Sequence, residues 1–309
     1  MNREVISDFT AHLKNRAKTD YEREILKFGK YIKKDLDMAT KEDAEKYIKH
    51  IRRKMAATTS VRIYRQLLSF YNYLYDNDLI AYNPFHKVKK PRASEQVKEE
   101  RLPSMEEMKK LLHVIRTDFN YRDYVFTLLI STTGLRLKEA IQVKWSDFIM
   151  DRVGTIGLTI RGGTDQERMV KILPLIWEEF RKYRKEFLGV REEYEGKDYY
   201  VFISTREMQA YKNYPASVGH MAESRIRHVY LGACSKAKIP LYTAKDLRHA
   251  HAVYALYMGA DEEQIKEQLG WYSIKNIRKY NGVLTKIRVS ANDYTEKYFK
   301  QLTKGEDEG

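Results

Sequence analysis

Residues 243–280 read TAKDLRHAHAVYALYMGADEEQIKEQLGWYSIKNIRKY, and we interpret the other segments by their relation to this stretch. Its first half holds two cations three residues apart, Lys245 and Arg248. Its second half closes on a glycine turn, Leu269-Gly270-Trp271, and ends in Tyr280. An ammonium and a planar guanidinium one helical turn apart can bind a single phosphate group. The stretch is therefore typical of one half of a phosphodiester-cleaving site, and the remaining sequence should supply the other half.

A second segment, STTGLRLKE at residues 131–139, contains Arg136 and Glu139 and follows a strongly apolar helical run. Gly134 permits a tight turn, after which a new helix carries the two charged side chains one turn apart on one face. Most pairs at this spacing are surface ion pairs, but a surface pair needs no such turn. Together, Lys245 and Arg248 would present an ammonium and a planar donor fork to one phosphate, the geometry that stabilises a phosphorane-like transition state without a metal.

In this order, the segments resemble the tyrosine recombinase (integrase) family, which includes phage and archaeal viral integrases and the Xer resolvases. TGLRLKE at 133–139 resembles the first arginine box of the family. KDLRH at 245–249 resembles the second box, usually His-Asp-Leu-Arg-His. LGW at 269–271, followed by Tyr280, resembles the Leu-Gly-His segment and the nucleophile. The helical pattern through Asn83-Pro84 is similar to the family's core-binding domain, so the resemblance spans roughly the whole chain.

The resemblance implies a role for each of these residues. Arg136 and Arg248 would hold the non-bridging oxygens of the scissile phosphate, and Glu139 would buttress the arginines. Tyr280 would attack phosphorus, which leaves a 3′-phosphotyrosyl link and a free 5′-hydroxyl. A 5′-hydroxyl of another strand can reverse that step, so no ATP, metal or other cofactor is implied. Two further catalytic positions depart from the commonest family residue, which is His at both: Lys245 begins the second box, and Trp271 follows Gly270.

The family's general-acid lysine, expected in the turn of a β-hairpin, has no counterpart here. Residues 153–173 predict such a hairpin, with GGTD in its turn, but the stretch 160–168 contains no lysine. Arg161 is our first candidate to act from the hairpin, although arginine holds its proton too tightly to be a good acid. Lys171, farther along the second strand, is the next candidate. Alternatively, Lys245 takes the acid role.

The predicted fold class is mainly α, with an N-terminal helical core-binding (SAM-like) domain and an α+β catalytic domain that contains a small antiparallel β-sheet. The predicted parts are a helical DNA core-binding domain at 1–85, a basic interdomain linker at 86–101, the catalytic domain at 102–290 and a C-terminal tail at 291–309.

Several element boundaries follow from local sequence. Helices should begin after Thr19-Asp20, after Thr40 and after one of Thr58 to Ser60. Ser104 with Glu107 has the form of a capping box that opens the second domain. Tyr199 to Ile203 is a candidate third strand.

The positive charge is concentrated in the first third of the chain. The net charge is +14, and residues 1–93 hold 21 basic and 12 acidic side chains. No Asp or Glu occurs from Lys46 through Tyr75, whereas a solvated helix face normally mixes both signs. The imbalance predicts a surface that follows DNA phosphates. Its candidate residues are Lys46, Lys49, Arg52, Arg53, Lys54, Arg62, Arg65, Lys87, Lys89 and Lys90.

Composition narrows the cellular setting. The single cysteine, Cys234, permits no internal disulfide. The sequence contains no run of about 18 apolar residues, the length that a membrane span requires. We therefore expect a cytoplasmic protein associated with the nucleoid, on chromosomal or mobile-element DNA. His249 and His251 cannot both face one metal from a helix, and no carboxylate lies at ligand spacing, so no metal site is predicted.

The resemblance implies an enzyme that exchanges strands between two double-stranded attachment sites as a homo-tetramer on DNA. It leaves open whether a DNA-bending accessory protein takes part. Residues 293–304 have amphipathic spacing and are expected to dock on a neighbouring protomer. Two competing functions remain: a type IB topoisomerase, which shares the Lys-x-x-Arg pattern and the tyrosine chemistry, and a DNA-binding protein whose catalysis is weakened by the missing hairpin lysine.

Overall fold

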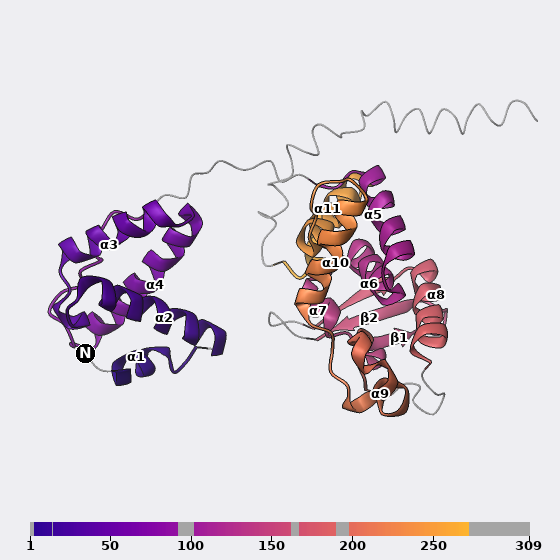
Figure 1. Cartoon of the computed structure of the whole chain (residues 1–309), viewed down its shortest axis with the longest axis horizontal. Helices are drawn as coiled ribbons and strands as arrows, with labels where there is room; N and C mark the ends of the chain where they lie inside the picture. The colour runs from indigo at the N-terminus through magenta and orange to yellow at the C-terminus, as the bar shows by residue number, and fades with distance from the viewer. Residues whose placement is uncertain (1–2, 14, 92–101, 162–166, 190–197, 272–309) are drawn as a thin grey trace, which may run out of the picture. The chain divides into compact units, whose positions relative to one another are not determined.

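The computed structural model describes residues 3–13, 15–91, 102–161, 167–189 and 198–271. The chain divides into two compact units, Met1–Lys98 and Glu99–Gly309, each with its own hydrophobic core. Helices dominate the described part of both units, and a three-stranded antiparallel sheet lies in the second (Figure 1). The predicted fold class, mainly α with a small antiparallel sheet, is confirmed.

The described part of the N-terminal unit is helical. Its helices are α1 Arg3–Thr10, α2 Asn15–Ile32, α3 Lys41–Lys54 and α4 Ala57–Asp76, with a short 3-10 turn, η1 Leu36–Met38, between α2 and α3. Aromatic side chains hold these helices together: Tyr71 of α4 packs edge-on against both Phe28 of α2 and its neighbour Phe70. All three rings are fully buried, so this aromatic cluster is the centre of the unit.

Only one of the three predicted N-terminal helix starts is confirmed. The hydroxyl of Thr40 accepts a hydrogen bond from the Asp43 amide, and the Asp43 carboxylate accepts one from the Thr40 amide, which is a capping box at the start of α3. The start of α2 at Asn15 precedes the predicted Thr19-Asp20 by about one turn. The predicted cap of α4 at Thr58 to Ser60 is wrong, because α4 already begins at Ala57 and buries Ser60.

The start of the predicted basic linker belongs to the N-terminal unit. Val88 is buried in the same core as Phe85, and the Tyr64 hydroxyl donates to the Val88 carbonyl over 3.0 Å. Residues 86–91 therefore continue the N-terminal unit beyond the helices.

The second unit combines helices with the sheet. Its longer helices are α5 Met105–Asp118, α6 Tyr121–Thr133, α8 Pro174–Lys182, α10 Glu223–Lys236, α11 Ala244–Tyr257 and α12 Glu262–Leu269. Shorter elements are α7 Leu137–Ile141, α9 Met208–Asn213, the 3-10 turns η2 Trp145–Asp147, η5 Thr205–Glu207 and η6 Pro215–Ser217, and the π-helical turn η3 Tyr183–Leu188. Ser104 and Glu107 form the predicted capping box at the start of α5.

The sheet has the strand order β1 Phe148–Met150, β2 Ile156–Ile160 and β3 Arg168–Ile172. Strands β2 and β3 form the predicted hairpin, with Ile160 opposite Arg168. The prediction of a third strand at Tyr199 to Ile203 is wrong, because β1 occupies the free edge of β2. That segment instead bonds to the chain before β1: the Val201 amide donates to Val143, and the Trp145 amide donates to Tyr199.

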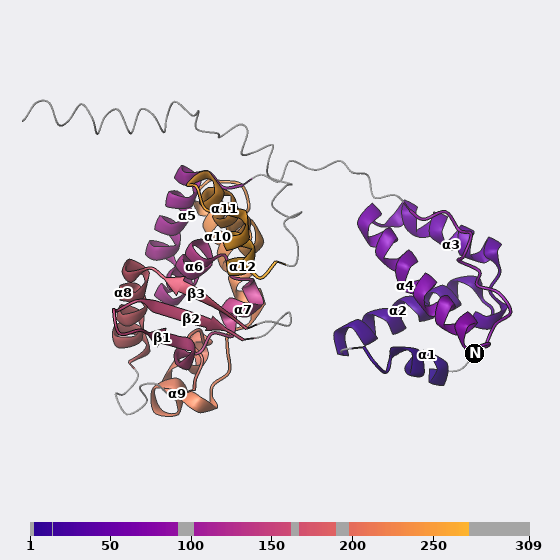
Figure 2. The ribbon, with the colours of Figure 1, turned by 180° about the vertical axis from the view of Figure 1, so that it is seen from behind.

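The ends of three helices meet near β3. Helix α6 packs against α11, and α12 contacts both α11 and β3. Figure 2 shows α12 beside β3. The segments that carry the predicted site residues, far apart in sequence, therefore lie side by side. Among the described residues, no helix has the length and apolar content needed to cross a membrane.

Candidate active site

The turn between α6 and α7 presents Arg136 next to a buried carboxylate. Gly134 ends α6 in the left-handed conformation (φ 66°), which redirects the chain so that Arg136 lies immediately before α7. The Glu139 carboxylate accepts hydrogen bonds from the Arg136 amide (2.9 Å) and from its Nη1 (2.7 Å). Glu139 is buried, whereas the Arg136 side chain is 36% exposed. The buried Glu139 carboxylate therefore fixes the orientation of Arg136, while part of the Arg136 side chain stays accessible to solvent.

Arg248 approaches the same place from α11, and its side chain is only 6% exposed. Its Nη1 donates to the Gly134 carbonyl (2.7 Å) and its Nη2 to the Leu269 carbonyl (2.6 Å). The nearest distance from its guanidinium to the Glu139 carboxylate is 3.9 Å. The two arginines, 112 positions apart in the sequence, are thus brought together around Glu139.

A third arginine, which the sequence interpretation did not select, completes this group. Arg168 begins β3, and its guanidinium donates to both Glu139 carboxylate oxygens, at 3.2 and 2.7 Å. Its Nε donates to the Gln268 carbonyl at 2.8 Å. Its position as the first residue after the hairpin turn, in phase with buried Val170 and Ile172, was the available signal.

The electrostatics of the group favour an anion. Burial lowers the pKa of the Arg248 guanidinium to about 9, the charge of Arg136 acts in the same direction, and Glu139 opposes both. At Glu139, burial acts to raise the pKa, but hydrogen bonds from Arg168 and Arg136 outweigh it and the pKa lies below its ordinary value. Three guanidinium groups around one ionised carboxylate leave an excess of positive charge, which a phosphate would offset.

A cavity of about 820 Å³ opens beside Arg136 and Arg248. Lys245, in the first turn of α11, and Trp271, which follows α12, also line it. The Arg248 guanidinium carbon lies 5.6 Å from the centre of the Trp271 ring. The structure therefore gathers four of the predicted catalytic side chains around one cavity, with Glu139 behind the arginines.

The two hairpin candidates lie elsewhere. The Arg161 side chain is 61% exposed and ion-pairs with Asp147 (3.5 Å) and Glu167 (3.9 Å). Lys171 is exposed and three residues from Arg168 on β3, so strand alternation directs it to the opposite face of the sheet. The structure does not bring Lys171 to the arginine group.

The match to known families agrees with this geometry. A model described as the phage integrase family matches residues 103–286, which is more than half of the chain. The chain belongs to the phage integrase family. It is therefore a tyrosine-type site-specific DNA recombinase, as the order of its sequence boxes predicted.

Relatives of this integrase include cellular recombinases. It is 25% identical over 291 residues to the tyrosine recombinase XerC of Staphylococcus aureus (strain JH9), and the alignment covers 90% of each chain. The tyrosine recombinase XerC of Caldanaerobacter subterraneus subsp. tengcongensis is 26% identical over 219 residues, which is 70% of this chain and 57% of that relative. The first alignment therefore extends over the N-terminal unit as well.

Solved recombinases share the fold of the integrase at low sequence identity. The XerH recombinase bound to its palindromic difH substrate, in a post-cleavage complex, has a TM-score of 0.67 and 19% identity, covering 86% of this chain and 76% of that one. A lambda integrase (75–356) dimer bound to a COC′ core site has a TM-score of 0.66 and 15% identity, covering 90% and 92%.

The remaining predictions concern the nucleophile, the C-terminal segment and the histidines of α11. Tyr280 lies outside the described residues, as does the segment 293–304. The His251 ring contacts the Ser131 carbonyl at 3.2 Å and the Gln268 amide nitrogen at 2.8 Å, which ties α11 to α6 and α12. Among the described residues, no cluster of His, Cys, Asp or Glu could hold a metal ion.

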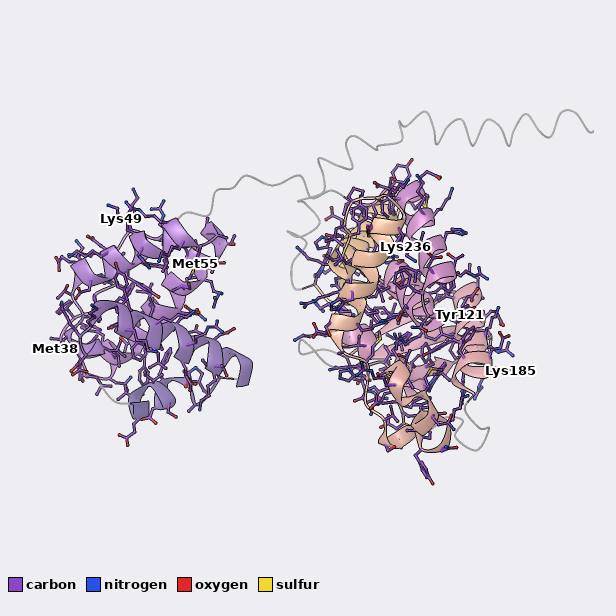
Figure 3. The ribbon with its side chains drawn as sticks, viewed as in Figure 1. Met38, Lys49, Met55, Tyr121, Lys185 and Lys236 are labelled. Carbon is purple, nitrogen blue, oxygen red and sulfur yellow. The ribbon has the colours of Figure 1, made fainter. Side chains whose placement is uncertain are left out.

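The basic residues predicted to bind DNA all lie on the surface of the N-terminal unit. The ten predicted DNA-binding cations are exposed, and within the described part of this unit none of them forms an ion pair with Asp or Glu. Lys46, Lys49 and Arg53 follow at helical spacing along α3, and Figure 3 shows Lys49 on the outer side of that helix. Cations in this arrangement are available to a polyanion.

Proposed function

We propose that Arg136 and Arg248 bind the scissile phosphate of DNA and that Tyr280 is the nucleophile that cleaves it. The observation that carries this proposal is the convergence of both arginines on Glu139, beside a cavity that Lys245 and Trp271 also line. Guanidinium groups fixed before the reaction stabilise the charge that develops on the phosphate oxygens.

The bond changes balance without an outside energy source. The Tyr280 oxygen forms a bond to phosphorus as the bond from phosphorus to the 5′ oxygen breaks. The phenol releases its proton to bulk water, and the leaving 5′ oxygen gains one from a protein donor that water then reprotonates. Lys245 is the proposed proton donor, because it lines the same cavity as Arg248 from the first turn of α11. Trp271 donates a hydrogen bond to the phosphate through its indole N–H.

The proposed substrate is a pair of duplex attachment sites. The exposed cations of the N-terminal unit would follow the phosphates of each site, and their lack of ion pairs in the described part supports this assignment. The XerH and lambda integrase structures that share the fold are bound to DNA. We extend the proposal to a homo-tetramer on chromosomal or mobile-element DNA in the cytoplasm, with residues 293–304 docking on a neighbouring protomer.

The extent of the relationship supports strand exchange over DNA relaxation. The alignment with the Staphylococcus aureus XerC covers 90% of both chains, so it includes the N-terminal unit as well as the catalytic boxes. A type IB topoisomerase is therefore the disfavoured alternative. A DNA-binding protein that lacks catalysis would form no covalent protein–DNA intermediate, whereas a recombinase and a topoisomerase would both form one.

A nicked suicide substrate tests the proposal directly. Loss of the short 5′-hydroxyl fragment prevents religation, so a cleaving enzyme accumulates as a covalent protein–DNA adduct. The wild type should form the adduct, Tyr280→Phe should form none, and both should bind the DNA equally well. A wild type that binds but forms no adduct on any candidate site would refute the catalytic assignment.

A further inference from the structure

Three successive carbonyls at the end of α12 each accept a hydrogen bond from a different arginine. Arg168 Nε donates to Gln268 (2.8 Å), Arg248 Nη2 to Leu269 (2.6 Å) and Arg136 Nη2 to Gly270 (2.9 Å). The last carbonyls of a helix lack partners within the helix and form its negative pole, so they favour cations. The end of α12 is therefore held by the same group of arginines that surrounds Glu139.

Arg168 differs from the other two because two of its guanidinium nitrogens donate to Glu139, whereas Arg136 donates through one and Arg248 lies 3.9 Å away. From β3 it contacts Glu139 in α7 through two nitrogens and α12 through the third. Its side chain is 13% exposed, against 36% for Arg136. Arg136 and Arg248 line the cavity and Arg168 is not among its lining residues, so a phosphate entering there would meet the first two arginines.

The backbone around Arg168 is shaped to admit it. Gly270 has a positive φ of 58°, and a Cβ added there would lie 3.1–3.3 Å from the Arg168 guanidinium. That contact is tighter than normal van der Waals packing, so a Cβ at 270 would require the Arg168 guanidinium to shift by a few tenths of an ångström. Gly270 of the LGW segment thus has two roles. It ends α12 in the left-handed conformation, and it leaves room for the Arg168 side chain.

We propose that Arg168 is a positioning residue, which orients Glu139 and the end of α12 and thereby couples the β-hairpin to the chain leading to Tyr280. This inference rests on the proposed function. Without Arg168, the free edge of the Glu139 carboxylate would compete with DNA for Arg136, and the last turn of α12 would lose one of its ties to the sheet. Arg168 supports the chemistry through its neighbours and does not touch the substrate.

Two substitutions separate charge from geometry. Lysine keeps the charge but cannot span Glu139 and the Gln268 carbonyl at once, whereas methionine removes both features. Cleavage of the suicide substrate at saturating DNA should slow about 100-fold in Arg168→Met and about tenfold in Arg168→Lys, the scale expected for misplaced catalytic groups. DNA affinity should change less than twofold. The matched control is Arg181→Met on α8, where an exposed arginine pairs only with Glu178 among the described residues.

A double-mutant cycle and hydrogen exchange complete the test. If Arg168 acts through Glu139, the rate of Glu139→Gln/Arg168→Gln should equal that of the slower single variant. Amides at Gly270 and Trp271, hydrogen-bonded to Glu267 and Lys266, should exchange faster in Arg168→Met than in the wild type or Arg181→Met. Rates and exchange both at wild-type levels in Arg168→Met would overturn the inference. If the wild type formed no adduct, the proposed function would fail, and the exchange comparison alone would decide the role of Arg168.

Discussion

The Nη1 atom of Arg248 lies 2.7 Å from the carbonyl oxygen of Gly134, a residue 114 positions earlier in the chain. This hydrogen bond joins α11 to the turn that delivers Arg136, so the placement of one arginine depends on the backbone that carries the other. Mutations in the turn and in the arginines should therefore have separable effects on stability and on cleavage.

Gly134→Ala should be strongly destabilising. The added Cβ would lie 2.4 Å from Leu269 Cδ2 and 2.8 Å from His251 Cδ2, in a residue with φ 66°. We expect about 1 kcal/mol for the left-handed backbone and roughly 1–3 kcal/mol more for overpacking, measured by urea unfolding. Gly154→Ala is the matched control, because Gly154 also has a positive φ (82°) but nothing within 4 Å of its Cβ position. Equal losses in the two variants would contradict the packing argument.

Arg136→Ala and Arg248→Ala should both abolish the covalent adduct but differ in stability. Loss of Arg248 leaves the buried carbonyls of Gly134 and Leu269 without this donor, which costs on the order of 2–4 kcal/mol. Arg136 is partly exposed, and its removal should lower stability much less. Thermal unfolding and adduct formation, measured on the same preparations, check this. A lower melting temperature for Arg136→Ala than for Arg248→Ala would be the wrong order.

His251 should make stability depend on pH below its ordinary pKa of 6.5. Burial lowers its pKa, and the neutral ring contacts Gln268 and Ser131. The unfolded chain then binds a proton more readily than the folded protein, so stability is complete above about pH 6.5 and falls as the pH decreases. Each unit of pKa depression contributes about 1.4 kcal/mol. Urea unfolding from pH 7.5 to 5.5 should show a steeper decline in the wild type than in His251→Gln, and parallel curves would argue against this role.

The cations of α3 should carry part of the salt dependence of DNA binding. The triple variant Lys46→Gln, Lys49→Gln, Arg53→Gln should reduce the slope of log K against log salt by about 0.9 for each phosphate contact that is lost. The control removes three cations from α2, Lys18, Arg23 and Lys27, each of which has a nearby carboxylate. Fluorescence anisotropy across a salt series measures both slopes. Identical changes in the two variants would show that only net charge matters.

Lys245→Ala should slow cleavage of ordinary DNA far more than cleavage of DNA with sulfur at the bridging 5′ position. A thiolate leaves without protonation, so such a substrate does not need a general acid. The same substrate should not rescue Arg136→Ala, because that arginine acts on the non-bridging oxygens. A Lys245→Ala defect that persists with the sulfur substrate would remove Lys245 from the proton-donor role.

The segments of the site could be predicted from the sequence because each one has a local cause. Gly134 marks a turn, and the hairpin is marked by alternating residues around GGTD. Arg248 lies three residues after Lys245 on the predicted helix. The order of these motifs then indicated the family, and the convergence of distant arginines followed from that resemblance.

Arg168 could not be selected in the same way, because the sequence indicates only the face of the strand on which it lies and not its partners. In the sequence it is one of several polar residues around the hairpin turn, and only the approach of α7 and α12 to β3 gives it Glu139 and Gln268 as partners. The incorrect strand at Tyr199 to Ile203 has a similar origin. Its apolar residues are buried, as in a strand, but the sheet edge that it would need is taken by β1.

Two of the three carbonyls at the end of α12 also affect the entropy of substrate binding. A long arginine side chain loses roughly 1.5–2 kcal/mol of rotamer freedom when it is immobilised. Here Arg136 and Arg248, the two proposed phosphate-binding arginines, are held by the main-chain oxygens of Gly270 and Leu269. These side chains lose their rotamer entropy when the protein folds, so little more is lost when they bind a phosphate.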